Sequence, residues 1–416
     1  MSGVETPTRR PSISRSVWFV LIVVFIDMIG IGIAMPVIPV LVGEYVGDDE
    51  RAAQTHWFMA MTVAYGGMQF LCAPALGALS DRYGRRPVLI TAVIGLGLHY
   101  LMIGFARTLW LMLGARLFGG LTGASFSVAN AYLADVSAPE DRAKAFGMVG
   151  AAFGFGFICG PPLGGFLGEI DLHLPFLVAA GLSFANAIYG YFVVTESLPP
   201  ERRGTFSWSK ANPFRALSAL LRSHAASDVV LIYSIYMLAH ATMIQTWVLS
   251  SHFRFGWTTA QNGILLGCVG LLSAIVQGGL VGRLVKWLGE ERLALWALGT
   301  NVVVQTLYGL APQGWMLFVI LFSGFIVFTA GAALQGVVSK ATDARTQGVT
   351  MGAMTSISSL SFVVGAIAGN GILGAVSALP ASNILMGANF FFTAMLNLIA
   401  FALLMRRRGR VIAAAA

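Results

Sequence analysis

Long apolar segments follow one another along almost the whole chain, with short polar loops between them. They cover residues 17–42, 53–79, 87–106, 109–135, 142–168 and 174–194, and then 228–250, 260–284, 291–310, 314–340, 346–374 and 383–405. A helix of about 20 apolar residues crosses a hydrocarbon core of about 30 Å. Hydrophobic residues occupy 57% of the 416 positions, so no soluble domain of useful size remains. The sequence therefore predicts an all-α polytopic membrane protein with twelve transmembrane helices.

Lysine and arginine are confined to alternate loops. Apart from Arg51, Arg107, Arg116 and Arg254, they all lie near the chain ends or in and beside the loops that follow the even-numbered segments. By the positive-inside rule, these loops and both termini are cytoplasmic. The net charge of +8 comes from this distribution, so it does not indicate a partner nucleic acid. No small-residue cleavage site follows the first apolar segment, so we expect that segment to be retained as a span.

The longest polar stretch divides the chain into two halves. It contains Pro199, Pro200 and Pro213, which favour a linker over a helix. We therefore expect an N-terminal six-helix bundle over 1–195, a cytoplasmic linker over 196–227 and a C-terminal six-helix bundle over 228–416. The halves also share a repeat, because the spacing from Gly77 to Gly84 recurs from Gly282 to Gly289.

The loop between the second and third segments carries five ionisable residues in six positions, in a chain that is only 11% charged. The run Gly77-x-Leu-Ser-Asp81-Arg82-x-Gly84-Arg85-Arg86 resembles the corresponding loop of the major facilitator transporters. That resemblance implies the major facilitator fold and a charge relay that latches the two halves in the outward-facing state. The residues it assigns to this gating latch are Gly77, Asp81, Arg82, Arg85 and, at the end of the fourth segment, Asp135. Gly77 is expected to let another helix approach closely.

In the second half, Lys286 and Glu290 replace Asp81 and Arg85 of this loop. The repeat has thus lost the residues of the family motif. We therefore expect only the first loop to act as a latch.

Asp27 lies near the middle of the first apolar segment. A carboxylate at this depth costs on the order of 3 kcal/mol on insertion scales, so it must face a cavity or a partner. Arg116 of the fourth segment is the candidate partner, and opening or closing a cavity around the pair would change the proton affinity of the acid. The run from Arg116 to Gly120 resembles the family's fourth-helix motif, in which the arginine serves proton coupling. A purely structural buried acid remains the alternative.

The fifth segment contains Gly160-Pro161-Pro162-Leu163-Gly164-Gly165. Its small residues permit close helix contact, and it resembles the antiporter signature of the family, marked by Gly160, Pro161, Gly164 and Gly165. No nucleotide-binding loop, metal-binding histidine pair or nucleophile elbow is present in the sequence. The three cysteines have no paired spacing. We therefore expect neither an enzyme nor a metal or cofactor site.

Several runs resemble the tetracycline-proton antiporters more specifically. They are Asp27-Met-Ile-Gly-Ile-Gly, Met35-Pro-Val-Ile-Pro39, Ala131-Tyr-Leu-Ala-Asp135, Glu196-Ser, Trp247-Val-Leu, Arg254-Phe-Gly-Trp257 and Leu334-Gln-Gly-Val-Val. Asp27, Arg116 and Gln277 match that branch. However, His99 and Asn301 stand where its third and ninth helices carry acids, and Ser273 stands where its eighth carries a histidine. The resemblance therefore implies a proton step but leaves recognition of a metal-chelated tetracycline in doubt.

Polar and aromatic residues within the spans are the candidates for the wall of a substrate cavity. They are Gln69, His99, Asn130, Tyr236, His240, Gln245, Trp247, Gln277, Asn301 and Gln335. His99 has two interpretations, a neutral imidazole hydrogen-bonded inside the bundle or a group that meets substrate or protons. With Asp27 opposed by Arg116, we expect a neutral to slightly positive cavity, which favours neutral, zwitterionic or anionic cargo.

The sequence thus predicts a monomeric, proton-coupled antiporter that exports a small amphipathic drug or metabolite across a bacterial inner membrane. Its expected partners are the small-molecule substrate, protons and membrane lipid. Three alternatives stay open: a proton-independent facilitator or uptake carrier, a true tetracycline exporter, and a non-transporting sensor or lipid-handling protein.

Overall fold

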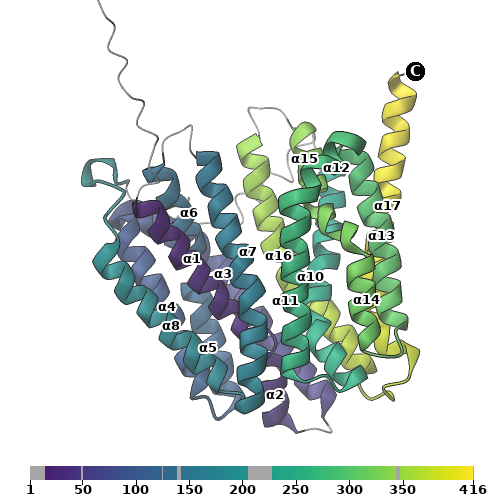
Figure 1. Ribbon diagram of the computed structural model, residues 1–416, viewed down its shortest axis with the longest axis horizontal. Coiled ribbons are helices and arrows are strands. Elements are labelled where there is room, and N and C mark those ends of the chain that lie inside the picture. Colours follow the sequence, from purple (N-terminus) through teal and green to yellow (C-terminus); the bar gives the residue numbers. More distant parts are fainter. Residues whose placement is uncertain are drawn as a thin grey trace, which may run out of the picture.

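The computed structural model describes residues 15–47, 50–123, 125–137, 142–204, 227–342 and 347–415. All regular secondary structure in these ranges is helical. The N-terminal half contains α1 (Arg15–Ala34), α2 (Ile38–Val46), α3 (Arg51–Tyr83), α4 (Arg85–Gly104), α5 (Leu109–Thr122), α6 (Ser125–Val136), α7 (Arg142–Ile170), α8 (Leu174–Val193) and the short 3-10 helix η1 (Pro200–Arg202). Figure 1 shows these helices gathered in one half of the molecule.

The C-terminal half forms the other group of helices in Figure 1. It contains α10 (Ser227–Phe255), α11 (Thr259–Ile275), the π-helical turn η2 (Val276–Leu280), α12 (Val281–Leu288), α13 (Glu290–Leu310), α14 (Trp315–Ser323), the 3-10 turn η3 (Phe325–Thr329), α15 (Ala330–Lys340), α16 (Gln347–Val376), the 3-10 turn η4 (Ile384–Gly387) and α17 (Ala388–Ala415).

The helices account for the predicted spans, three of which are interrupted. Among the described residues, ten helices are long and apolar enough to cross a membrane, and α14 with the helix from Phe325 to Lys340 makes an eleventh, bent by 58°. The predicted fourth span, 109–135, appears as the shorter apolar helix α5 and then α6. The all-α polytopic architecture predicted from the sequence is therefore confirmed.

The first span, expected as one segment, is also broken. Helix α1 ends at Ala34, and α2 begins at Ile38 with Pro39 in its first turn. Proline lacks the N–H that a helix interior needs, but it fits a first turn. Pro36 lies between the two helices, so the chain crosses here by a turn instead of a continuous helix.

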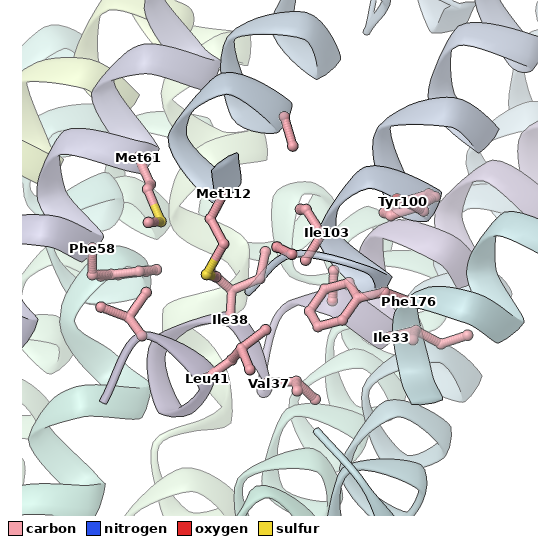
Figure 2. Packing of buried hydrophobic residues seen from close by; sticks show 14 of the residues in the cluster. Ile33, Val37, Ile38, Leu41, Phe58, Met61, Tyr100, Ile103, Met112 and Phe176 are labelled. Carbon is pink, nitrogen blue, oxygen red and sulfur yellow. The ribbon is translucent and has the colours of Figure 1, made fainter. Parts of the chain in front are cut away.

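The buried clusters show where the two halves meet. One cluster joins α1, α4, α6 and α7, and another joins α10, α13, α15 and α17, so each belongs to a single half. Two further clusters include residues of both halves. Figure 2 shows part of one of these, with Ile38, Leu41, Phe58 and Met112 packed around α2.

We call the side with the α3–α4 loop and the end of α17 the latch side, and the side with α2 the closed side. In Figure 1 the C-terminus lies at the top and α2 at the bottom. The clusters confined to one half include the residues next to the α3–α4 loop, whereas the shared clusters include α2. The halves are therefore joined at the closed side. The domain boundaries at 195 and 228 stay a prediction, since most of the linker lies outside the described residues.

Candidate functional site

Asp27 lies inside the N-terminal half, where α1 packs against α8. It is only 3% exposed. Asn186 of α8 contacts it, with Nδ2 3.5 Å from Oδ1 of Asp27, and the same Nδ2 donates to the Val23 carbonyl at 3.3 Å. A buried carboxylate in a span is costly unless polar groups surround it. Asn186 is thus one of the polar groups that lower the cost of burying Asp27, and nothing in the sequence marks it for this role.

Two tyrosines connect this acid with Arg116 of α5. Tyr65 of α3 and Tyr100 of α4 each lie within electrostatic range of both Asp27 and Arg116. The guanidinium of Arg116 stacks on Tyr65, with Cζ 4.3 Å from the ring centroid, a favourable cation–π geometry. Tyr100 packs against α1, where a Cβ built at Gly30 would lie 3.1 Å from the ring. Asp27 and Arg116, which the sequence predicts as partners, therefore belong to one cluster that also contains Tyr65 and Tyr100.

His99 belongs to the packing beside this cluster. It is 1% exposed, and its Nδ1 lies 2.7 Å from the Ala115 carbonyl. A carbonyl only accepts, so Nδ1 carries the proton. Its ring lies against Gly119, where a Cβ would collide with it. The structure favours the first interpretation of His99, an imidazole hydrogen-bonded inside the bundle.

The other cavity candidates of the N-terminal half are only half-buried. Gln69 of α3 donates from Nε2 to the Gly123 carbonyl at 2.8 Å, beside the break between α5 and α6. Asn130 lies on α6. Gln69 therefore stabilises a helix end, and Asn130 remains a candidate for contact with substrate.

Four candidates of the C-terminal half lie on α10. Tyr236 and His240 stack, with centroids 6.0 Å apart and an interplanar angle of 15°. Trp247 is buried edge-on against Tyr308 at 5.1 Å, and its Nε1 has no hydrogen-bond partner among the described residues. Gln245 is half-buried. This helix thus contributes a neutral, largely aromatic surface.

The last three candidates differ in exposure. Asn301 is buried on α13. Gln277 and Gln335 are exposed, on η2 and α15 respectively, and Gln277 donates to Ser273 Oγ at 2.5 Å. A substrate cavity lined by the predicted residues therefore stays a prediction.

The antiporter motif of α7 packs on two sides. Towards α1, Cβ atoms built at Gly160 and Gly164 would overlap backbone atoms of Gly32 and Ile33. Towards α11, one built at Gly165 would overlap the Thr259 carbonyl. Small residues allow such close approach of helices. The motif is therefore a packing surface that α7 shares with both halves.

Pro161 completes the contact with α11. Its carbonyl lies where a Cβ of Gly263 would be. Nearby, Thr259 Oγ1 donates to the Gly165 carbonyl at 3.0 Å, and Glu169 accepts from the backbone N–H of Ala260 at 3.0 Å. Glu169 thus caps the first turn of α11. These hydrogen bonds join the two halves on the closed side, and the role of Glu169 was missed in the sequence.

The predicted latch is assembled around Arg85, the first residue of α4. Its guanidinium contacts Asp81 at 2.6 Å and Asp135 at 3.1 Å, and it donates to Ser80 Oγ at 2.6 Å. Three helices, α3, α4 and α6, are tied together in this way. Its partners all lie in the N-terminal half, so in this structure the latch does not bridge the halves through any described residue.

Glu196 also belongs to the group of contacts around Arg85, although its sequence context predicts no role for it there. Its carboxylate accepts from the backbone N–H groups of Arg85 at 2.8 Å and Arg86 at 3.3 Å, so it caps α4. Gly84 has φ +104°, and a Cβ there would overlap this carboxylate. Only glycine therefore fits at this turn.

Two members of the predicted latch stand apart. No atom lies within 4 Å of a Cβ built at Gly77, so the close helix approach expected there is absent among the described residues. Arg82 stacks over Tyr83 at 5.2 Å and lies at the surface. The close approaches lie elsewhere: Gly84 meets the Glu196 carboxylate, and the motif glycines of α7 meet the backbones of α1 and α11.

Comparison with known proteins identifies the family. The family model described as Major Facilitator Superfamily matches residues 20–366. The chain is 36% identical to the class C tetracycline resistance protein of Escherichia coli, over 82% of this chain and 85% of that protein. It is 27% identical to multidrug resistance protein 2 of Bacillus subtilis strain 168, over 68% and 69% of the two chains.

Solved structures agree on the fold. An inward-facing, unoccupied bacterial homologue of the human lysosomal transporter Spinster matches with a TM-score of 0.73 at 16% identity, covering 95% of this chain and 97% of that one. The human organic anion transporter MFSD10 matches with a TM-score of 0.69 at 24% identity, over 95% and 100%. The chain belongs to the Major Facilitator Superfamily.

Proposed function

We propose that this protein exports a small amphipathic drug or metabolite in exchange for protons, by alternating access across a bacterial inner membrane. The observation that carries the proposal is the cluster around Asp27, a buried acid grouped with Arg116 through Tyr65 and Tyr100. A buried carboxylate in a span is a proton site whose affinity depends on the charges and polar groups around it. The drug-resistance names of the relatives support the same reading.

The orientation follows from the positive-inside rule, which makes the latch side cytoplasmic. The contacts between α7 and α11 then lie on the periplasmic side, and each half has a separate buried cluster on the cytoplasmic side. These contacts support an inward-facing state. Loading from the cytoplasm in this state and release after closure of the latch side would complete an export cycle.

The substrate class that we propose differs from the one that the names of the relatives suggest. Several relatives are tetracycline resistance proteins. This chain has His99 and Asn301 at the two positions where that branch is expected to carry acids, and it thus lacks carboxylates that would attract a chelated cation. We propose a neutral, zwitterionic or anionic cargo and expect tetracycline to be a poor substrate. Strong tetracycline resistance conferred by the unmodified protein would overturn this assignment.

Proton release from purified protein tests the exchange itself. A thermal-shift screen of candidate compounds identifies a ligand, which is then added to lightly buffered protein containing a pH indicator. An antiporter releases protons when the substrate binds, whereas a facilitator or a sensor binds it without release. Binding without any proton release between pH 6 and pH 8 would contradict the proposal.

A further inference from the structure

The C-terminal half contains a counterpart of the latch at the same places in the fold. Gly84 joins α3 to α4 with φ +104°, and Gly289 joins α12 to α13 with φ +74°. Each turn is closed by the glycine N–H, which donates to the carbonyl four residues earlier, that of Ser80 at 3.1 Å and of Val285 at 2.9 Å. The two loops therefore share one backbone geometry, although the charged motif is not repeated.

The charges that follow these glycines are exchanged. Arg85 is the first residue of α4 and contacts Asp135 near the end of α6 at 3.1 Å. Glu290 is the first residue of α13 and contacts Lys340 at the end of α15 at 2.5 Å. The same two structural positions thus hold an ion pair in both halves, with the opposite sign. The sequence motif gives no sign of this pair, because a reversed pair looks like two unrelated substitutions.

The residue that follows each of these, Arg86 in one half and Glu291 in the other, contacts the last helix of its half. Arg86 donates from Nη2 to the Tyr191 carbonyl of α8 at 2.7 Å. Glu291 pairs with Arg407 of α17 at 3.2 Å. Each network therefore joins the corresponding three helices of its half on the latch side.

The reversed charge also explains why a separate acid, Glu196, caps α4, whereas α13 begins with its own acid, Glu290. An arginine at the start of a helix opposes the helix dipole, and Glu196 compensates by capping α4. Glu290 supplies its own negative charge at the start of α13 and interacts with its own backbone N–H. In the described part of the chain, nothing lies within 4 Å of a Cβ built at Gly289, whereas Gly84 is covered by Glu196.

Glu290 is also seated against its partner helix. It is only 21% exposed, whereas Lys340 is 69% exposed. A Cβ built at Gly336, one turn before Lys340, would lie 2.9 Å from Glu290 Cγ. The acid is therefore packed against α15, and the lysine reaches it from the surface.

We propose that Glu290 and Lys340 form a second latch, opposite in charge to the first, which holds the latch-side ends of α13 and α15 together during the transport cycle. This inference rests on the alternating-access transport proposed above. Because the attraction between the two partners of an ion pair is the same when their charges are exchanged, the reversed pair performs the same task as Arg85 with Asp135.

Charge exchange between the partners tests the proposal. Glu290→Lys and Lys340→Glu should each lower the export rate about fivefold or more in vesicles, with the affinity for the thermal-shift ligand unchanged. The double variant should recover to within about twofold of the wild type. Asp228→Asn is the matched control, since it breaks another pair of the same half, with Arg410 at 3.8 Å, in which both side chains are exposed. It should leave the rate unchanged.

A distance measurement keeps this test independent of proton coupling. Spin labels at Tyr83→Cys and Trp287→Cys, two exposed latch-side positions, are placed in a variant lacking the three native cysteines. Each single charge variant should shift the ratio of short to long distances, and the exchanged pair should restore it. If a reversed single variant does not fold, Glu290→Gln is measured instead.

Two results would overturn the second latch. One is wild-type rates and distances in both single variants. The other is impaired single variants that the exchange does not rescue. Failure of proton coupling in the whole protein, by contrast, would leave the distance result standing and would reject only the proposed function.

Discussion

The guanidinium of Arg116 stacks on the ring of Tyr65, with Cζ 4.3 Å from the centroid. Arg116 Nε is buried without a hydrogen-bond partner among the described residues, so the ring is a major part of its environment. Tyr65 also lies within electrostatic range of Asp27. We therefore expect the electrostatic interaction between Asp27 and Arg116 to depend on Tyr65, an aromatic side chain from a third helix.

This stacking predicts different outcomes for two substitutions of Tyr65. Tyr65→Phe keeps the ring and should retain most of the proton-driven export. Tyr65→Leu removes a cation–π contact worth about 0.5–2 kcal/mol and should lower the export rate several-fold. Transport in inverted vesicles with an imposed pH gradient measures both. Equal rates in the two variants would show that the ring does not hold Arg116.

Arg85 is predicted to control the rate of cycling without affecting binding. Arg85→Ala removes the contacts with Asp81 and Asp135, so transport should slow about tenfold while the ligand Kd stays unchanged. Arg82→Ala should have a much smaller effect, because Arg82 only stacks on Tyr83 at the surface. Loss of ligand binding in Arg85→Ala would contradict a gating role.

The glycines of α7 are predicted to differ sharply in tolerance. A methyl group at Gly164 would overlap the backbone of Ile33, whereas one at Gly154 would have no described atom within 4 Å. Gly164→Ala should therefore destabilise the protein by about 1–3 kcal/mol, seen as a lower midpoint in thermal unfolding in detergent. Gly154→Ala serves as the control, and a midpoint equal to that of Gly164→Ala would refute the packing assignment.

His99→Asp is predicted to damage the fold instead of restoring a tetracycline site. The imidazole donates to the Ala115 carbonyl, and a carboxylate there would face that oxygen with no proton to share. The cost is on the order of 3 kcal/mol for a carboxylate at this depth. His99→Gln keeps a donor and should be better tolerated. Tetracycline export gained by His99→Asp with Asn301→Asp, at normal expression, would contradict this account.

The sequence predicted the helical architecture and the residues around Arg85 because both depend on short-range sequence patterns. Apolar length gives the spans. Pro36 and Pro39 account for the break after α1. The family motif assigned Asp81 and Arg85 to one latch, and the turn at Gly84 brings the two side chains together. Asp27 and Arg116 were found because ionisable groups are rare within spans.

The remaining contacts depend on which helix faces which neighbour, and one chain without a structure does not reveal that. Asn186 and Tyr65 are ordinary residues until packing brings them to Asp27 and Arg116. Glu290 and Lys340 are far apart in sequence and reversed in sign, so no motif marks them. The sequence also does not tell which cavity candidates are buried and which are exposed, and the structure places Gln335 at the surface and Asn301 in the interior.

The central claim is that Asp27 carries the coupled proton, and Asp27→Asn tests it most directly. The change keeps the shape of the side chain but removes the titratable group. Glu44→Gln, an equivalent change of an exposed acid on α2, is the control. The measurement is accumulation of the identified substrate in inverted vesicles against a pH gradient, at matched expression. We predict that Asp27→Asn abolishes accumulation but still binds ligand, while Glu44→Gln accumulates normally; full accumulation by Asp27→Asn would contradict the account.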